Sequence, residues 1–295
     1  MKGFVTIATG DDKYYKMAVN LLLSYRHFTK DPFPFAIISD RENEFTRLFD
    51  KVVILPTPHR SFMDKINLLS YAPFDESIFI DADCLAYRDL NQYWSLFHDC
   101  SAFSAFGSTY SINEQNPFYD YEGTGVLKDR ISYLTHLHGG VYYIRKGEAC
   151  TQLLLTCQYI IGHYNEFDFK LFPDAPADET VFALAMSVEG MKPVHAPPEM
   201  MCFYPCNTHF KSDISRGFAE FSMPWFPEHT IVRDCYCVHW GSFTIPKPVY
   251  QLEAYRLNKM LHKERISPLM IVIKKVSLPL SYLWGRVKKK LKSFG

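Results

Sequence analysis

The chain has 295 residues, of which 47% are hydrophobic and 22% are charged, and its formal net charge is zero. This composition can fill a large core and excludes a globally disordered chain, and the length suits one large α/β domain or two small ones. The charge is unevenly spread, because residues 263–295 hold nine Lys or Arg against one acid and therefore carry +8, while the remainder carries −8.

The first third of the chain alternates short apolar runs with helical patterns. The runs predict strands at 4–8, 35–38, 52–55 and 77–80, and the patterns predict helices at 14–28, 42–49 and 64–71. Strand–helix alternation with continuous apolar strands is typical of a parallel sheet that is covered on both faces. Ligands of such sheets bind beyond the carboxyl ends of the strands. Residues 9–12 and 81–83 follow two of these strands, so we expect a ligand site there.

The pattern is less regular in the second half. Residues 108–129 are polar and rich in Gly, Asn and Tyr, which predicts a long loop, and residues 197–227 are predicted to be irregular. The remaining predicted elements are strands at 140–144 and 236–239 and helices at 148–164, 178–188 and 249–262. In the tail, Pro268 and Pro279 are expected to interrupt any single long helix.

The chain contains eight cysteines. The N-terminus has no charged start followed by a long apolar stretch, which predicts no secretory signal and therefore reduced thiols. Two groups of residues could together form a zinc site: Cys202, Cys206 and His209, and Cys235, Cys237 and His239. Neither group has the tight paired-cysteine spacing of a zinc ribbon, so buried or half-exposed thiols are the favoured interpretation.

The triplet Asp81-Ala82-Asp83 directly follows the apolar run 77–80. Carboxylates two positions apart at a strand end point the same way and can converge on one divalent ion. Hard oxygen ligands suit Mg²⁺ or Mn²⁺, and such an ion offsets the charge on a departing diphosphate. The alternative is a pair of solvated turn carboxylates.

The context of this triplet is more specific than the triplet itself. Residues 65–69 (KINLL) followed by 77–85 (SIFIDADCL) resemble the heart of the GT-A glycosyltransferases, and of glycosyltransferase family 8 in particular. That family includes glycogenin and bacterial lipooligosaccharide galactosyltransferases. Further segments match in the same order: 8–14 (ATGDDKY), 138–141 (HGGV), 177–182 (ADETVF), and 239–241 (HWG) with 247–248 (KP).

The resemblance spans roughly residues 3–250 and implies an α/β fold of the GT-A type, a mostly parallel, Rossmann-like sheet flanked by helices. We expect residues 1–262 to form the catalytic domain and residues 263–295 to form a basic tail. The implied metal ligands for Mn²⁺ or Mg²⁺ are Asp81, Asp83 and His239. The implied donor-binding residues are Ala8, Thr9, Asp11, Tyr14, Lys65, Asp81, Ala82, Asp83, His138, Gly139, Gly140, Gly241 and Lys247.

Each implied role has an alternative. Lys65 and Lys247 would contact the diphosphate as cations, although Lys65 could be a helix-surface lysine. Tyr14 could stack on the base and Asp11 could bond its edge, or Asp11 could only cap the following helix. His239 could be a hydrogen-bonded strand-end histidine. The two glycines before residue 141 could simply form a turn.

Asp178 and Glu179 are the expected catalytic residues. An inverting enzyme needs a carboxylate base on the acceptor hydroxyl. A retaining enzyme, which the resemblance implies, can let the leaving diphosphate take that proton, and the carboxylate then positions or stabilises. Asp178 also precedes a predicted helix and could cap it. We expect one of the two residues to lie in the site.

These residues predict transfer of a hexosyl group from a nucleotide-diphosphate sugar, a UDP-sugar by the family's usual preference, to a glycan or lipid-linked acceptor. A nucleotidyltransferase of related fold is one alternative, but it would carry a Gly-rich, basic loop where residues 9–12 are acidic. A non-catalytic, sugar-binding descendant of the fold is another.

The tail contains no uncharged run long enough to span a bilayer. Its basic, interrupted apolar sequence predicts contact with an anionic membrane surface, at the cytoplasmic face, rather than with nucleic acid. The bacterial relatives of family 8 end in a similar tail, which implies an acceptor near the membrane.

Overall fold

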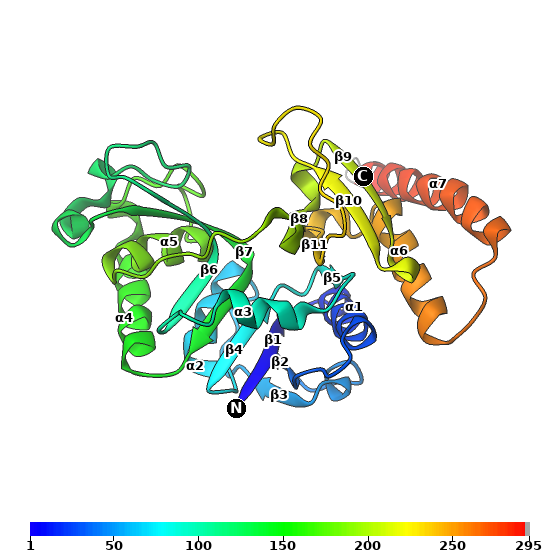
Figure 1. Ribbon diagram of the computed structural model, residues 1–295, viewed down its shortest axis with the longest axis horizontal. Helices are drawn as coiled ribbons and strands as arrows, with labels where there is room; N and C mark the ends of the chain where they lie inside the picture. The colour runs from blue at the N-terminus through cyan, green and yellow to red at the C-terminus, as the bar shows by residue number, and fades with distance from the viewer. Residues whose placement is uncertain (293–295) are drawn as a thin grey trace. The chain divides into compact units, whose positions relative to one another are not determined.

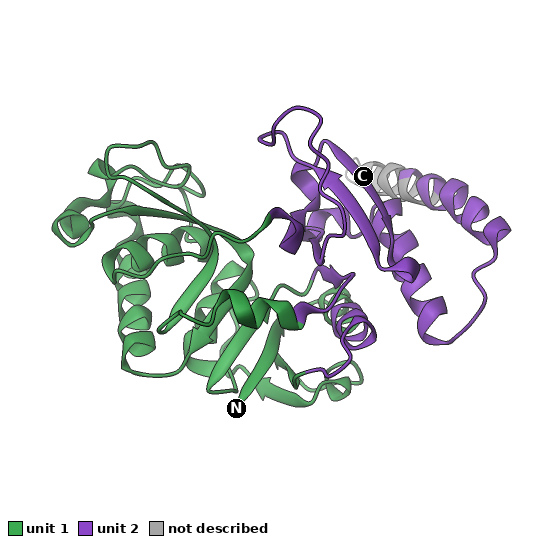
Figure 2. Ribbon diagram, in the orientation of Figure 1, with its two compact units in different colours: residues 1–19, 33–82, 91–197 green, residues 20–32, 83–90, 198–295 purple. Residues whose placement is uncertain are grey.

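The computed structural model describes residues 1–292, and the chain divides into two compact units (Figure 2). Unit 1 comprises residues 1–19, 33–82 and 91–197, and unit 2 comprises residues 20–32, 83–90 and the chain from 198 onward. Residues 293–295, the end of the predicted basic tail, lie outside the described residues.

Unit 1 is built on a six-stranded sheet of order β3-β2-β1-β4-β7-β6 (Figure 1). Its strands are β1 (Lys2–Ala8), β2 (Phe35–Ser39), β3 (Lys51–Ile54), β4 (Glu76–Ile80), β6 (Phe103–Tyr110) and β7 (Leu134–Arg145). The first four are parallel, as their continuous apolar sequences predict. The strand β7 runs antiparallel to β4, and β6 runs antiparallel to β7. The mostly parallel α/β sheet is therefore confirmed.

Alternate side chains of each strand face opposite sides of this sheet. Val5 and Phe79 belong to the main core, to which α2 (Leu68–Tyr71), α4 (Glu148–Gly162) and α5 (Asp178–Val188) also contribute. Phe4 lies on the other side, where its ring is 5.7 Å from that of Trp94 in α3 (Tyr93–Leu96).

Unit 2 holds two smaller sheets and two long helices. A three-stranded sheet joins β5 (Cys84–Ala86), β11 (Cys237–His239) and β8 (Met201–Phe203), and a hairpin joins β9 (His209–Asp213) to β10 (Phe218–Ser222). The helices are α6 (Pro248–Leu261) and α7 (Pro268–Lys292). The fully buried Trp240 packs on Tyr204 and Tyr250, at 4.7 and 5.6 Å between ring centroids.

The helix α1 (Asp12–Phe28) starts in unit 1 and ends in unit 2. Short 3-10 helices connect the larger elements: η1 (Thr46–Leu48), η2 (Phe62–Asn67), η3 (Leu90–Gln92), η4 (Glu122–Arg130), η5 (Tyr164–Glu166), η6 (Pro198–Met200), η7 (Tyr204–Cys206), η8 (Ile214–Arg216) and η9 (Ser242–Thr244).

Four expectations for the secondary structure need correction. The predicted helix at 42–49 is only the single turn η1, and the strand predicted at 140–144 is the end of the twelve-residue β7. Residues 108–129 are not a continuous loop, because β6 enters this stretch and η4 begins in it. Residues 197–227 were expected to be irregular but contain β8, β9 and β10. The strand β8 pairs with the distant β11, which local patterns do not reveal, whereas β9 and β10 pair with each other in a hairpin that the sequence pattern did not predict.

The expected interruption of the tail helix at its prolines is also wrong. Pro268 is the first residue of α7, where a missing N–H costs nothing. Pro279 lies inside α7 and removes one hydrogen bond, yet the helix continues through it. Among the residues that the structure describes, no helix combines the length and apolar character needed to cross a membrane.

The packing of β1 yields a first prediction. A Cβ added at the buried Gly3 would lie 2.3 Å from the ring of Phe74, which is itself buried. We therefore expect Gly3→Ala to lower the free energy of unfolding by about 1–3 kcal/mol, measured by urea denaturation.

The matched control is Gly162→Ala at the exposed end of α4, where an added Cβ has no atom within 4 Å. We expect this variant to be neutral or more stable by up to about 1 kcal/mol. Equal stability of Gly3→Ala and the wild type would contradict the close packing of β1 on Phe74.

Candidate functional site

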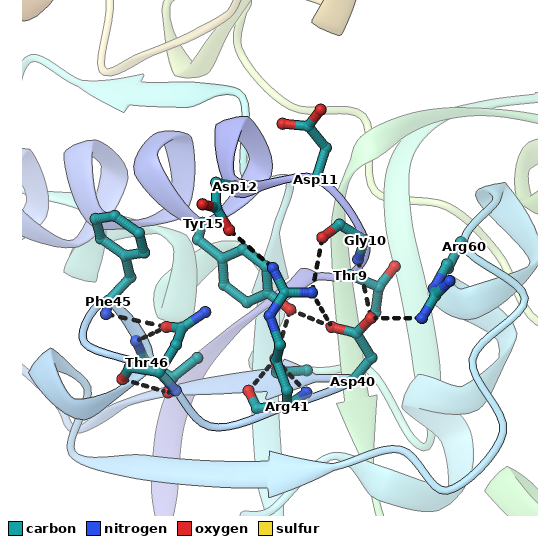
Figure 3. A network of polar contacts seen from close by, with 12 residues as sticks. Thr9, Gly10, Asp11, Asp12, Tyr15, Asp40, Arg41, Phe45, Thr46 and Arg60 are labelled. Atoms are coloured by element: carbon teal, nitrogen blue, oxygen red, sulfur yellow. Dashed lines mark hydrogen bonds and ion pairs between the residues drawn. The ribbon is translucent and has the colours of Figure 1, made fainter.

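The loop that follows β1 is held by the carboxylate of Asp40 at the end of β2 (Figure 3). Gly10 has a φ of +83°, which favours glycine, and its N–H donates to Asp40 Oδ2 at 3.1 Å. The Tyr15 hydroxyl donates to Asp40 Oδ1. Because Asp40 is almost completely buried, these bonds fix the loop to the end of the neighbouring strand.

Two arginines complete this network. Arg41 donates to the Gly10 carbonyl at 2.9 Å and pairs with Asp12 at 2.8 Å, and Arg60 Nη2 lies 3.3 Å from Asp40 Oδ2 (Figure 3). Burial alone would raise the pKa of Asp40, but the hydrogen bonds from Tyr15 and Gly10 and the arginine charges hold this pKa below its ordinary value. Burial and the bond to Asp40 raise the pKa of Tyr15 to about 12.

Asp64 attaches the same loop to η2. Its carboxylate accepts hydrogen bonds from Thr9 Oγ1 at 2.9 Å and from the backbone N–H groups of His59 and Arg60 at 2.7 and 2.9 Å. Asp64 is 2% exposed and directly precedes Lys65, so the loop after β1 and Lys65 have fixed positions relative to each other.

Of the residues predicted to bind the nucleoside, Ala8 is buried and Tyr14 is half-buried, whereas Asp11 is exposed. Asp11 Oδ1 accepts a hydrogen bond from the Lys13 N–H at 2.8 Å, at the start of α1. This is the capping contact that the sequence left open as an alternative. The Asp11 residue is exposed, so its predicted role is compatible with this contact.

Lys65 is the centre of a cluster of charges in unit 1. Its Nζ lies 2.8 Å from Asp81 Oδ2, 3.2 Å from Asp178 Oδ2 and 3.1 Å from the carbonyl oxygen of Gly139. Burial opposes the charged form of Lys65, but Asp178 and Asp81 outweigh it and raise its pKa above the ordinary value. Lys65 is therefore not the surface lysine that the sequence allowed.

Asp178 does not cap its helix. It is the first residue of α5, and the residue in the capping position, Ala177, makes no side-chain cap. The Asp178 carboxylate instead accepts a hydrogen bond from the Tyr142 hydroxyl at 2.5 Å. Burial and the charge of Asp178 raise the pKa of Tyr142 well above its usual range, so its hydroxyl stays protonated as the donor.

The Glu179 carboxylate packs directly against the backbone of Gly139, which leaves no room for a β-carbon there. Glu179 Oε1 accepts a hydrogen bond from the Gly139 N–H at 2.6 Å, and a Cβ at Gly139 would lie 2.7 Å from that oxygen. The next residue is tied to β4, because the Gly140 carbonyl accepts the Asp81 N–H at 3.0 Å. His138 Nδ1 lies 3.1 Å from the Gly140 nitrogen. Gly139 does more than form a turn, since it allows close approach of the Glu179 carboxylate to the backbone.

Asp83 and His239 meet in unit 2. Antiparallel pairing of β5 with β11 sets His239 opposite Cys84, and the Trp240 N–H donates to the Asp83 carbonyl at 3.0 Å. His239 Nε2 lies 3.0 Å from Asp83 Oδ1, and both residues are less than 10% exposed. The structure thus brings together two residues that the sequence assigned to a metal.

The donor atoms of this pair fit a divalent cation. Asp83, Cys84 and His239 each offer one ligand atom, all within 4.8 Å of one another. Asp83 Oδ1 is buried and, apart from His239 Nε2 at 3.0 Å, has no polar partner among the described residues, so a cation would satisfy its lone pairs. Carboxylate and imidazole together suit Mn²⁺, and the thiol of Cys84 would favour a softer ion such as Zn²⁺.

Two other predicted residues lie in unit 2. Gly241 has a φ of +70°, and a Cβ there would lie 3.0 Å from Pro205. Lys247 is half-buried at the start of α6, with its Nζ 5.7 Å from the Phe243 ring.

The cysteines do not form the zinc site that the sequence left open. None of the eight cysteines, all within the described residues, forms a disulfide, and the potential ligand group found there contains none of Cys202, Cys235 and Cys237. Burial raises the pKa of Cys202 and Cys235, so these thiols stay protonated.

Sequence reasoning missed Asp40, Asp64, Tyr142 and Cys84. Cys84 stands inside the quoted motif, and Asp40 follows a predicted strand, so both could have been found from their positions. Tyr142 and Asp64 carry no local signal for their contacts with Asp178 and Thr9, because these partners are distant in the sequence.

No protein-family model matches the chain, and no curated protein matches it. Among solved structures, an active-site mutant of LgtC matches with a TM-score of 0.51 and 13% identity, over 93% of this chain and 100% of LgtC. The chain has the GT-A fold. The LgtC galactosyltransferase in complex with donor and acceptor sugar analogs matches with a TM-score of 0.48 and 13% identity over the same shares. The bifunctional glycosyltransferase WbbM matches with a TM-score of 0.44 and 11% identity, over 68% of this chain, which spans 40% of WbbM.

The lowered pKa of Asp40 yields a prediction for the loop after β1. A carboxyl group whose pKa is lowered by folding contributes stability above its ordinary pKa, near 4, and loses it as the pH falls through the folded-state value. We expect Asp40→Asn to cost about 1–3 kcal/mol at pH 7, and the deficit to shrink as the pH is lowered toward 3. Urea denaturation at several pH values measures this difference.

Glu44→Gln, at an exposed position of the same region, is the control and should cost less than about 0.5 kcal/mol at every pH. A deficit of Asp40→Asn that stays constant from pH 7 to pH 3 would contradict the charged role of Asp40.

Proposed function

We propose that the chain is a metal-dependent glycosyltransferase that moves a hexosyl group from a UDP-sugar to a glycan or lipid-linked acceptor. The observation that carries this proposal is the 3.0 Å approach of His239 Nε2 to Asp83 Oδ1 in a chain of the GT-A fold. Asp83 and His239 are the proposed metal ligands, and Asp81, which the sequence motif also implies, pairs with Lys65 in unit 1. A bound Mn²⁺ or Mg²⁺ would offset the charge of the departing diphosphate.

The residues of unit 1 are proposed to bind the base and the sugar of the donor. Asp11 and Tyr14 contact the base, and the bonds of Asp40 and Asp64 hold their loop in place. Asp178 is 2% exposed and engaged by Lys65, so it positions that cation. Glu179 is half-buried and therefore accessible to a sugar hydroxyl.

The proposed stereochemistry is retention. Glu179 already accepts the Gly139 N–H, and Asp178 already pairs with Lys65, which makes both poor bases for the acceptor hydroxyl. The acceptor proton then goes to the leaving diphosphate on the same face of the sugar. In unit 2, Lys247 is proposed as a cation for that diphosphate.

The test is thermal stabilisation of the protein by UDP, GDP, CMP and ATP, each with and without manganese. We expect UDP with manganese to raise Tm by about 5 °C at 100 times Kd, and the other combinations to have little effect. Asp83→Asn and His239→Gln should abolish the rise, because each removes a ligand atom from the metal.

The matched controls are Asp99→Asn and His98→Gln, which change the same residue types at exposed positions. They should leave the rise unchanged. No rise with any nucleotide, or the same rise in all four variants, would overturn the proposed metal site.

We further propose that α7 binds an anionic membrane surface. Five of the exposed apolar side chains of α7 recur at intervals of three or four residues: Leu269, Val272, Val276, Leu280 and Leu283. At 3.6 residues per turn these lie on one face, and Lys274 and Leu278, which face α6, lie on the opposite one. A basic helix with one solvent-facing apolar row suits the interface of an anionic bilayer.

This proposal predicts the partition of the full chain into vesicles of phosphatidylcholine with 30% phosphatidylglycerol. The double variant Leu269→Ser/Val276→Ser should partition at least about a hundredfold less, since each buried aliphatic side chain contributes about 1.5–3 kcal/mol and the two together about 3–6 kcal/mol. Leu155→Ser, at an exposed apolar position in α4, is the control and should partition like the wild type. Equal partition of all three proteins would contradict a membrane role for α7.

A further inference from the structure

Two exposed phenylalanines lie together in unit 1. Phe62 begins η2 and is 55% exposed, and Phe172, in the segment before α5, is 40% exposed. Their ring centroids are 6.0 Å apart with an interplanar angle of 49°. Single exposed apolar residues are common, but a pair of aromatic rings from distant segments is a built feature that requires a cause.

The pair borders the charged cluster around Lys65. Lys65 Nζ lies 5.9 Å from the Phe62 ring centroid, while the same atom contacts Asp81, Asp178 and the Gly139 carbonyl. The Phe62 ring therefore lies beside the charged cluster.

Both segments contain a residue with a strained backbone that its surroundings hold in place. Phe172 has a φ of +56°, and Arg60, two residues before Phe62, has a φ of +55°. A residue with a β-carbon adopts this conformation at a cost and keeps it only where its surroundings enforce it. The Tyr164 hydroxyl does so for Phe172, since it lies 2.9 Å from the Phe172 carbonyl and 3.1 Å from Thr180 Oγ1 in α5. Asp64 does so for Arg60 by accepting its backbone N–H.

We infer that Phe62 and Phe172 form a platform that binds the ring of a hexopyranose. A pyranose has an apolar C–H face, which packs on an aromatic ring, and a rim of hydroxyl groups, which donate to carboxylates. Glu179 follows Asp178 on α5 and supplies a half-buried carboxylate for such a hydroxyl. Packing alone would bury the rings, whereas a binding surface leaves them exposed in the free protein.

This inference rests on the proposed function for its setting, because the ring is either the sugar of the donor or that of the acceptor. The two sources share the same chemistry and are separated by the experiment.

The experiment is saturation-transfer NMR with two sets of probes, methyl hexopyranosides and UDP-hexoses with manganese. It compares the wild type with Phe62→Ala, Phe172→Ala and Phe62→Trp, and with Leu155→Ala as a control at an exposed position in α4. We expect saturation of the sugar C–H protons in the wild type. Kd should rise roughly tenfold in each alanine variant and return to within about threefold in Phe62→Trp. Leu155→Ala should match the wild type.

The probes separate the outcomes. If the alanine variants bind methyl hexopyranosides with a higher Kd than the wild type does, the platform belongs to the acceptor. If their Kd rises only for UDP-hexoses, the platform belongs to the donor sugar. UDP alone should bind equally to all variants. Unchanged sugar affinity in both alanine variants, or no sugar saturation in a wild type that still binds UDP, would overturn the platform and leave the proposed function standing. Platform-dependent binding of hexosides without any nucleotide binding would overturn the proposed function alone.

Discussion

The ammonium group of Lys65, held between Asp81 and Asp178, is the interaction on which the arrangement of unit 1 depends. Three segments that are distant in the sequence converge on it: the end of β4, the start of α5, and Gly139 in β7. Buried carboxylates need a paired cation, because desolvation of an unpaired charge costs several kcal/mol. The position of Lys65 therefore constrains where each of these segments can lie.

The same constraint extends to the loop after β1. Asp64, next to Lys65 in η2, bonds Thr9, and Asp40 bonds Gly10 (Figure 3). Two buried carboxylates thus connect the predicted donor loop to the charged cluster. Loops that bind ligands must hold backbone groups in fixed directions, and a rigid sheet edge with internal ion pairs does so without a ligand present.

The sequence was sufficient to predict the parallel strands, because short continuous apolar runs that alternate with helical patterns are typical of a sheet covered on both faces. The family resemblance also assigned Asp83 and His239 to the same metal. Their segments meet in the structure because β5 pairs with β11. The sequence did not reveal Tyr142 as the partner of Asp178, because a tyrosine in an apolar strand carries the same pattern as any core residue. The strand β8 was missed for a related reason, since it pairs with the distant β11, whereas β9 and β10 form a local hairpin that the sequence pattern also failed to indicate. The continuation of α7 through Pro279 shows that the loss of one hydrogen bond does not end a long helix.

The central claim is that this chain cleaves a sugar nucleotide with the help of a divalent metal. The most direct measurement is the release of UDP from a panel of UDP-hexoses, with manganese and with a chelator. We expect slow hydrolysis of one UDP-hexose by the wild type, abolished by the chelator and reduced at least a hundredfold in His239→Gln, with Asp99→Asn equal to the wild type. The absence of release from every UDP-hexose, or release that persists in His239→Gln, would contradict the claim.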